Sequence, residues 1–463
     1  MSATAPTRLQ RLDRVKFSRR HGKLLAGSGV GWALDAMDVG LISFILTALI
    51  TQWQLDTTQA SIIASSGFLG MALGASVGGA LADRIGRRTV FALTLVVYGV
   101  ATGLSALTPA PGGGVSVWTA VIVLSGLRLL VGIGLGAELP VASTLVSEFS
   151  PAPIRGRIIV LLEAFWALGW VLAAVVAFFL VPALPSGWRW AFALGAIPAF
   201  YAIVIRRGLP ESVRFLESKG RHDEAEEIVQ SFEESSAATT REPALFRTDT
   251  AAPADAPEEV DEAAPTGFAG LWTRDHAART VALWAVWFGV NFAYYGAFTW
   301  MPTLLVNAGF PMVRSFGFTL IITLAQIPGY AVSAFLIEKW GRRATLATFL
   351  LGSAVSAVSF GLATSETMVL VTGCLLSFFN LGAWGALYAV TPEIYPTTIR
   401  GTGAGSAAAF GRLASIIAPL VVPLLFARGG LPTVFVVISV AFAVACVAAI
   451  CLPEWRGRRL RET

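Results

Sequence analysis

Six ionisable side chains lie inside otherwise apolar stretches of this chain. They are Asp35, Asp38, Arg128, Glu138, Glu163 and Arg412. A charged group at the centre of a membrane-spanning helix costs roughly 2.5–3.5 kcal/mol on insertion scales, so each of them needs a functional or structural reason. The three histidines, His21, His222 and His276, all fall in polar segments. Proton chemistry within the apolar stretches therefore depends on carboxylates.

Asp35 and Asp38 are three residues apart, which places them on one face of a helix. Two carboxylates this close in a low-dielectric setting do not both ionise cheaply, so one of them is expected to hold a proton. Arg128, in the middle of another apolar stretch, is the natural partner of the pair. Two interpretations stay open: a proton-coupling site, or a static buried ion pair that fixes the packing of two helices.

Arg412 lies in the middle of a stretch that contains no acidic residue. A guanidinium group stays charged inside proteins and therefore needs an anion. A ligand carboxylate suits it because Arg binds carboxylates in a bidentate way; the alternative is a structural bridge to a carbonyl or a distant acid. Glu138 and Glu163 are expected to line an inner cavity or to pair with donors at helix ends.

The composition explains the setting of these residues. The chain has 463 residues, of which 55% are hydrophobic and 14% are charged, and its mean hydropathy is +0.69. Soluble domains carry roughly 25% charged residues, so most soluble enzymes and nucleic-acid binders are excluded despite a pI of about 9.3. Gly132, Gly134 and Gly136 fall inside an apolar stretch, which favours close helix packing over nucleotide binding. The three cysteines have no metal-ligand or disulfide-framework spacing, so neither kind of site is expected.

Twelve apolar stretches are long enough to cross a bilayer, which takes ~20 residues in a helix. Their length and lack of strict alternation favour helices over barrel strands. If the termini and the even-to-odd loops share one side, that side holds 29 of the 34 Lys and Arg residues, so both termini are expected in the cytoplasm. The stretches are 24–50, 59–82, 89–108, 117–139, 157–181, 189–206, 280–307, 315–337, 344–363, 367–391, 402–426 and 431–452.

A long loop separates the first six stretches from the last six. It begins with an amphipathic charged segment and continues into a tract rich in Ala, Pro, Thr and acidic residues, which is expected to be disordered because it cannot bury a core. The predicted organisation is a basic N-terminal segment 1–23, a six-helix bundle 24–206, a cytoplasmic linker 207–279, a second six-helix bundle 280–452 and a basic tail 453–463.

The two halves repeat the same charged motifs in the same order. EFSPAPIRG recurs as EIYPTTIRG, and DRIGRR recurs as EKWGRR. Such repetition predicts two bundles around a central site, the architecture of an alternating-access transporter. A network that forms only when the cytoplasmic side is closed biases a two-state equilibrium, although single surface ion pairs contribute only roughly 0–1 kcal/mol. The expected inner gate comprises Asp83, Arg84, Arg87, Arg88, Glu148, Arg155, Glu338, Lys339, Arg342, Arg343, Glu393 and Arg400. The alternative is that these charges only set the orientation.

The segments GGALADRIGRR, RLLVGIGLG and PESVRFL resemble the major facilitator superfamily, in its sugar-porter and organic-ion branch. At a finer level GWALDAMDVGLISF, GAELPVASTLVSE, LLEAFWALGW and SFFNLGAWGALYAVTPEIYPT are similar to the bacterial niacin (nicotinate) transporters. The resemblance covers the whole chain. It implies an all-α integral membrane protein with twelve helices in two pseudo-symmetric bundles, without cofactor, metal or enzymatic activity.

The resemblance also implies roles for individual residues. Asp38 aligns best with a proton-coupling Asp that this branch places near the Arg of an RxxxGxG pattern, which is Arg128 in this chain. An Arg near the position of Arg412 marks anionic substrates. The ring of such a substrate needs aromatic faces and a polar contact, although helix packing is the alternative explanation for any single residue. The predicted substrate-binding residues are Arg412, Asn380, Trp384, Tyr294, Tyr295, Asn291, Gln326 and Trp166.

The sequence thus predicts import of nicotinate by alternating access with proton symport. The alternatives are a symporter for benzoate-like acids, another transporter such as a sugar porter or an exporter, and a facilitator-fold receptor that does not transport. Arg412 argues against neutral sugars, and the costly intramembrane charges argue against a receptor. The expected setting is a monomer in the inner cell membrane whose partners are the substrate, protons and lipid, with no nucleic acid.

Overall fold

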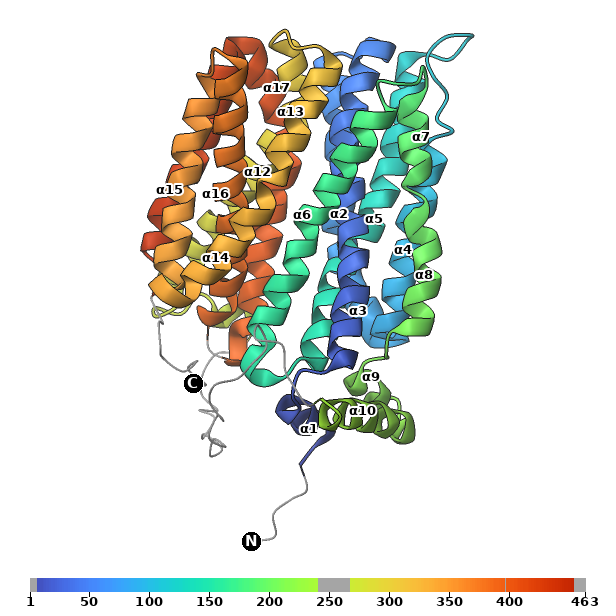
Figure 1. The fold of residues 1–463 in the computed structure, drawn as a ribbon, viewed down its shortest axis with the longest axis vertical. Coiled ribbons are helices and arrows are strands. Elements are labelled where there is room, and N and C mark those ends of the chain that lie inside the picture. The colour runs from blue at the N-terminus through green and yellow to red at the C-terminus, as the bar shows by residue number, and fades with distance from the viewer. Residues whose placement is uncertain (1–5, 240–266, 396, 454–463) are drawn as a thin grey trace.

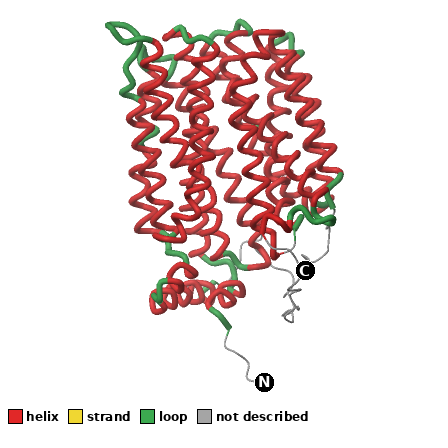
Figure 2. Tube along the Cα trace, turned by 180° about the vertical axis from the view of Figure 1, so that it is seen from behind, coloured by secondary structure: helices red, strands yellow, loops and turns green. Residues whose placement is uncertain are grey.

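The computed structural model describes residues 6–239, 267–395 and 397–453. Within these ranges the regular elements are helices, apart from one isolated bridge between Gly112 and Val115. The long helices run along one axis, and three short helices lie beneath one end (Figure 1 and Figure 2). Most of the tract expected to be disordered, and the end of the basic tail, lie outside the described residues.

The first half of the chain forms six membrane-length segments. Asp56 and Ser116 cap α3 and α5, since their side chains accept backbone N–H groups over 2.8 and 3.1 Å. Gly86, with φ of +98°, lets the chain turn directly from α3 into α4. The helices are α2 (Arg19–Trp53), α3 (Thr57–Ile85), α4 (Arg87–Ser105), α5 (Val117–Phe149), η1 (Ala152–Ile154), α6 (Arg155–Leu180), α7 (Gly187–Leu194) and α8 (Ile197–Gly208).

The second half repeats this plan. Its helices are α11 (Gly267–Gly270), α12 (Ala277–Asn307), α13 (Met312–Leu324), α14 (Gln326–Trp340), α15 (Arg342–Gly361), α16 (Glu366–Val390), η3 (Thr391–Glu393) and α17 (Thr397–Ile450). α17 is two helices joined at a kink, because Gly429 and Gly430 leave the helical conformation. Eleven segments of the described chain are long and apolar enough to cross a membrane, and the last crosses twice. The expected twelve-helix fold is confirmed.

The two halves meet at the end of the molecule opposite α1. Thr47 of α2 and Thr303 of α12 are hydrogen-bonded through their hydroxyl groups over 2.8 Å. Phe44 of α2 packs edge-on against Phe316 of α13 with ring centroids 5.1 Å apart. Ser65 of α3 donates to the carbonyl of Ile416 in α17 over 3.3 Å. These contacts join the two halves at that end.

The short helices α1 (Arg8–Arg14), α9 (Val213–Ser218) and α10 (His222–Ala237) form a cap under the first half (Figure 1). Arg11 binds both Glu226 and Glu233, over 2.7 and 2.6 Å. Hydrogen bonds from Arg11 are the main reason that the pKa of each of these two carboxyls lies below its ordinary value. Leu12 is fully buried in the cap. The charged segment after the sixth crossing is thus helical, with its polar face paired to the N-terminus.

Glycines allow the backbones of α3 and α5 to touch. A Cβ atom on Gly132 would lie 2.0 Å from the carbonyl oxygen of Gly67, and one on Gly136 would lie 2.0 Å from that of Met71. A Cβ on Gly134 would lie 2.9 Å from the Cβ of Tyr98 in α4. These distances leave no room for a side chain, which explains the glycine pattern by helix packing.

We expect Gly132→Ala to destabilise the protein by about 3 kcal/mol or more, because the new methyl group meets backbone that cannot move aside. Gly126→Ala is the matched control on the same helix, since its Cβ would have no atom within 4 Å. The measurement is the melting temperature of both purified variants in detergent. Equal melting temperatures would contradict the packing role of Gly132.

Candidate functional site

Asp38 of α2 and Arg128 of α5 form a buried ion pair. Arg128 donates from Nη1 to Asp38 Oδ2 over 2.9 Å, and Thr102 of α4 donates to Asp38 Oδ1 over 2.5 Å. The side chains of Asp38 and Arg128 are 1% and 4% exposed. Sequence reasoning missed Thr102, although a polar residue within an apolar stretch was the signal available. The structure therefore brings Arg128 together with Asp38.

Asp35 lies on the same helix as Asp38 but has different neighbours. It lies beside Glu138 of α5 and Tyr98 of α4, whereas Arg128 pairs with Asp38. Glu138 is fully buried. In this structure Glu138 is therefore enclosed by side chains, and its role as a residue of the inner cavity stays a prediction.

Arg412 of α17 retains most of its donor capacity. Its Nη1 donates to the hydroxyl of Tyr295 over a long 3.4 Å. Glu163, on α6 in the other half, is 3% exposed and lies within electrostatic range of Arg412 and Tyr295. Among the described residues, no carboxylate lies within 4.0 Å of the Arg412 guanidinium. Since a guanidinium group offers five N–H donors, the site can accept an anion.

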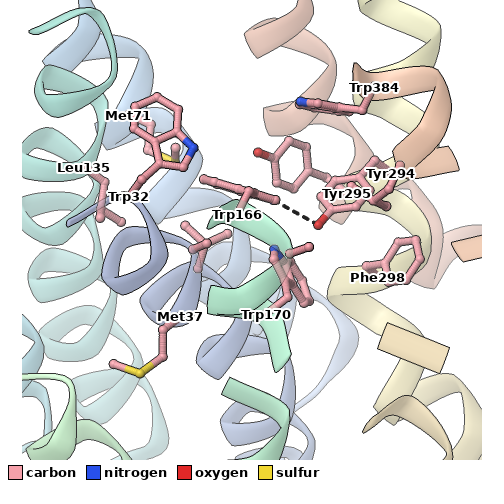
Figure 3. Close-up of a cluster of buried hydrophobic side chains, with 14 of the residues drawn as sticks. Trp32, Met37, Met71, Leu135, Trp166, Trp170, Tyr294, Tyr295, Phe298 and Trp384 are labelled. Atoms are coloured by element: carbon pink, nitrogen blue, oxygen red, sulfur yellow. Dashed lines mark hydrogen bonds between the residues drawn. The ribbon is translucent and has the colours of Figure 1, made fainter. Parts of the chain in front are cut away.

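Aromatic side chains from both halves surround this position. Trp166 of α6 points across the interface and donates from Nε1 to the hydroxyl of Tyr294 in α12 over 3.1 Å (Figure 3). The ring of Tyr294 lies 5.0 Å from that of Tyr295 and 5.1 Å from that of Trp384 in α16. Trp170 adds an edge contact to Tyr294 at 5.7 Å, which sequence reasoning missed. The cluster offers flat apolar faces next to the Arg412 cation.

The three amide side chains predicted for the site fall into two groups. Asn291 is satisfied, since it donates to the carbonyl of Trp287 over 2.8 Å and accepts from Ser415 over 3.1 Å. Gln326 and Asn380 are fully buried, and neither amide makes a well-formed hydrogen bond among the described residues, although Gln326 lies next to the hydroxyl of Tyr294. Gln326 begins α14, directly after the helix break at Ala325. Buried polar atoms in native proteins are rarely left unpaired, so these two amides are candidates for contact with a polar ligand or water.

In the first half, the residues expected at the inner gate are held by partners of that same half. Arg87 contacts Glu148 and lies 3.7 Å from Asp83. Arg88 donates its backbone N–H to Glu211 over 3.0 Å. Glu148 accepts a hydrogen bond from Ser212. Arg155 contacts Asp13 and donates to the carbonyl oxygens of Ser147 and Ser150. Arg84 is exposed. Glu211, Ser212 and Asp13 were missed by sequence reasoning, although Glu211 and Ser212 lie in the PESVRFL motif.

In the second half, Arg342 donates from Nε to Glu393 over 2.9 Å. Arg343 and Arg400 donate to the carbonyl oxygens of Leu452 and Tyr395. Lys339 is exposed, with its Nζ 5.5 Å from the ring of Phe335. The side chain of Glu338 lies outside the described residues. The gate motifs thus form corresponding networks in the two halves.

The chain is similar to known transporters over most of its length. Residues 19–463 match the family described as "Sugar (and other) transporter". The niacin transporter NiaP of Acinetobacter baylyi is 46% identical over 98% of this chain and 99% of its own length. The putative niacin/nicotinamide transporter NiaP of Bacillus subtilis is 43% identical over 92% of this chain and 93% of its own. The xylose transporter XylE from E. coli, in a partially occluded inward-open conformation, superposes with a TM-score of 0.75 at 20% identity, over 96% of this chain and 100% of that one.

Proposed function

The chain belongs to the sugar (and other) transporter family, and from this premise we propose that it imports nicotinate together with a proton. It is a multi-pass membrane transporter of a small molecule, with the major facilitator fold. The names of the two niacin transporter relatives support nicotinate as the substrate. The proposed setting is the inner cell membrane, with the chain as a monomer in lipid and both termini in the cytoplasm.

One observation supports the substrate proposal above all: Arg412 has free N–H donors and lies next to aromatic rings, and two buried amides in this half lack well-formed hydrogen bonds within the described ranges. Arg412 would bind the carboxylate of nicotinate, and the rings of Tyr294, Tyr295 and Trp384 would flank the pyridine ring. The N–H groups of Gln326 or Asn380 would donate to the ring nitrogen. Trp166 closes the cluster from the other half, whereas Asn291 orders α12 against α17.

The unpaired amides also separate nicotinate from its rival. Benzoate carries the same carboxylate and ring but has no ring nitrogen to accept a hydrogen bond. A site that buries unpaired donors disfavours the analogue that lacks the acceptor. Import of benzoate-like acids is therefore the second candidate, and a receptor without transport is the third.

The proposed cycle uses the two bundles, 24–206 and 280–452, as rocking units. The two halves are in contact at the end opposite α1, which would be the outer side with cytoplasmic termini. The substrate carboxylate would become the anion next to Arg412, and a proton would neutralise a carboxylate of the first half. The gate networks around Glu148 and Glu393 would join across the cytoplasmic side when it closes. Asp38, released from its proton, would bind Arg128 again.

The test is uptake of labelled nicotinate into proteoliposomes, with and without an inward proton gradient and with excess nicotinamide, benzoate or glucose outside. We expect gradient-stimulated uptake that only unlabelled nicotinate blocks strongly. If benzoate blocked uptake as strongly as nicotinate does, the substrate class would instead be benzoate-like acids. Substrate binding without uptake or counterflow would favour the receptor.

A further inference from the structure

A pair of carboxyl groups is buried in the first half, and one of them, Asp35, lies about one helical turn from Asp38 of the Asp38–Arg128 ion pair. Asp35 of α2 is 4% exposed and Glu138 of α5 is fully buried. A Cβ atom on Gly31 would lie 3.2 Å from Glu138 Oε1, and Gly31 is one turn before Asp35 on α2. Glu138 therefore reaches the face of α2 that carries Asp35, in the space that Gly31 leaves free.

This pair has no cation. Arg128 is bound to Asp38, and neither Asp35 nor Glu138 forms an ion pair within the described part of the chain. The titratable groups that face the pair are Tyr98 from α4, Tyr201 from α8 and Asp38 on α2 itself. On α6, Glu163 faces Arg412. No other charged side chain among the described residues is found to interact with Asp35 or Glu138. Two buried carboxylates without a cation cannot both stay charged.

The hydrogen bonding of the pair is incomplete without a proton. Thr94 of α4 donates to Glu138 Oε2 over 3.2 Å. In contrast, Asp35 Oδ1, Glu138 Oε1 and the hydroxyl of Tyr98 are buried without a well-formed hydrogen bond in the described structure, although the three side chains lie next to one another. The Tyr98 hydroxyl can donate to one carboxylate, but two ionised carboxylates offer each other only acceptors, so one added proton supplies the donor that joins them. Unpaired buried oxygens of this kind point to a bound proton.

We propose that Asp35 and Glu138 together bind one transported proton, at a site separate from Asp38 and Arg128. The proposal rests on the proposed proton symport. Asp35 lies about 4.5 Å nearer than Asp38 to the α1 end along α2, and Glu138 lies ~15 Å beyond Arg128 in the same direction along α5. The pair thus stands between the ion pair and the α1 end of the molecule.

The proton balance of this step is simple. The O–H bond of protonated Asp38 breaks, and an O–H bond forms on the singly charged Asp35–Glu138 pair, which already shares one proton and becomes neutral. Asp38 becomes a carboxylate and binds Arg128 again. The pair later releases its proton to water at the α1 end. The pair would thus let substrate release and proton release occur as separate steps.

The experiment compares wild type with Asp35→Asn, Glu138→Gln and the double variant in proteoliposomes. Two readouts are needed: counterflow exchange of labelled nicotinate, which needs no net proton movement, and accumulation driven by a proton gradient. With one proton per substrate, a gradient of about one pH unit supports about tenfold accumulation, because one such unit is worth ~1.4 kcal/mol. We expect the variants to keep counterflow and to lose this accumulation. Asp223→Asn, an exposed acid on α10, is the control that keeps both.

Infrared spectroscopy of the purified protein gives an independent readout that needs no variant to transport. Wild type should show the band of a buried, protonated carboxyl group at neutral pH, and the double variant should lack it. Wild-type accumulation by the double variant, or absence of this band in wild type, would overturn the proposal. If wild type itself fails to exchange nicotinate, the proposed function fails, but the infrared band still decides whether the pair holds a proton.

Discussion

Replacing Arg412 with glutamine is expected to lower the affinity for nicotinate by about 100-fold or more, because the substrate carboxylate then enters a buried site without its cation. Among the described residues the guanidinium group makes one long hydrogen bond, to Tyr295, so its loss should leave the fold largely intact. Binding of nicotinate to the purified variant and its uptake into proteoliposomes should fall together. The melting temperature without substrate should stay close to that of wild type.

Two companion variants make this test specific. Arg412→Lys keeps the charge but loses the planar fork, so it should bind nicotinate with an intermediate affinity. Arg428→Gln removes an exposed cation from the same helix and should leave affinity unchanged. If Arg412→Gln bound nicotinate like wild type, or if Arg428→Gln weakened binding equally, Arg412 would not be the anion site.

Glu163→Gln tests the other side of the same site. In the proposed cycle Glu163 faces Arg412 in the absence of substrate and competes with the substrate carboxylate. The neutral variant should therefore bind nicotinate more tightly, and its affinity should depend less on pH. Binding isotherms at several pH values measure both effects. Weaker binding in Glu163→Gln would instead make Glu163 a direct substrate ligand.

The fold was accessible from sequence because its determinants are local. Apolar length identifies the crossings, even where two of them form the continuous segment α17, since Gly429 and Gly430 mark the turn. The glycines of α3 and α5 likewise indicate close packing without any knowledge of the partner helix. The depth of each residue along its helix also follows from the residue numbers, because the helix rise per residue is constant.

The neighbours of each buried charge were less accessible, because they depend on how helices are rotated against each other. Residues three apart on a helix differ by about 60° in direction, so Asp35 and Asp38 can face different helices. Glu138 and Glu163 lie at similar depths by sequence, yet one faces Asp35 within its own half and the other faces Arg412 across the interface. Asn291 was predicted for the substrate site from its place one turn before Tyr295, whereas its partners, the carbonyl of Trp287 and the hydroxyl of Ser415, could not be inferred from spacing.

Single substitutions in the ion pair between Asp38 and Arg128 are expected to lower stability and transport more than any other substitution in the first half. Asp38→Asn leaves the positive charge of Arg128 buried without a negative partner. Arg128→Gln leaves the negative charge of Asp38 buried without a positive partner. Breaking a buried pair in this way costs about 3–5 kcal/mol. Each single variant should therefore melt at a much lower temperature than wild type, and each should fail to accumulate nicotinate in response to a proton gradient.

The double variant Asp38→Asn/Arg128→Gln separates the structural role of this pair from its coupling role. Two neutral amides can hydrogen-bond to each other and to Thr102, so much of the lost stability should return. No titratable carboxylate remains at this position, so gradient-driven accumulation should stay lost while counterflow exchange returns. Recovery of stability and accumulation together would show that the pair only fixes the packing of α2 against α5. Recovery of stability alone would assign proton coupling to Asp38, because a purely structural pair has no reason to affect the response to a gradient once the fold is restored.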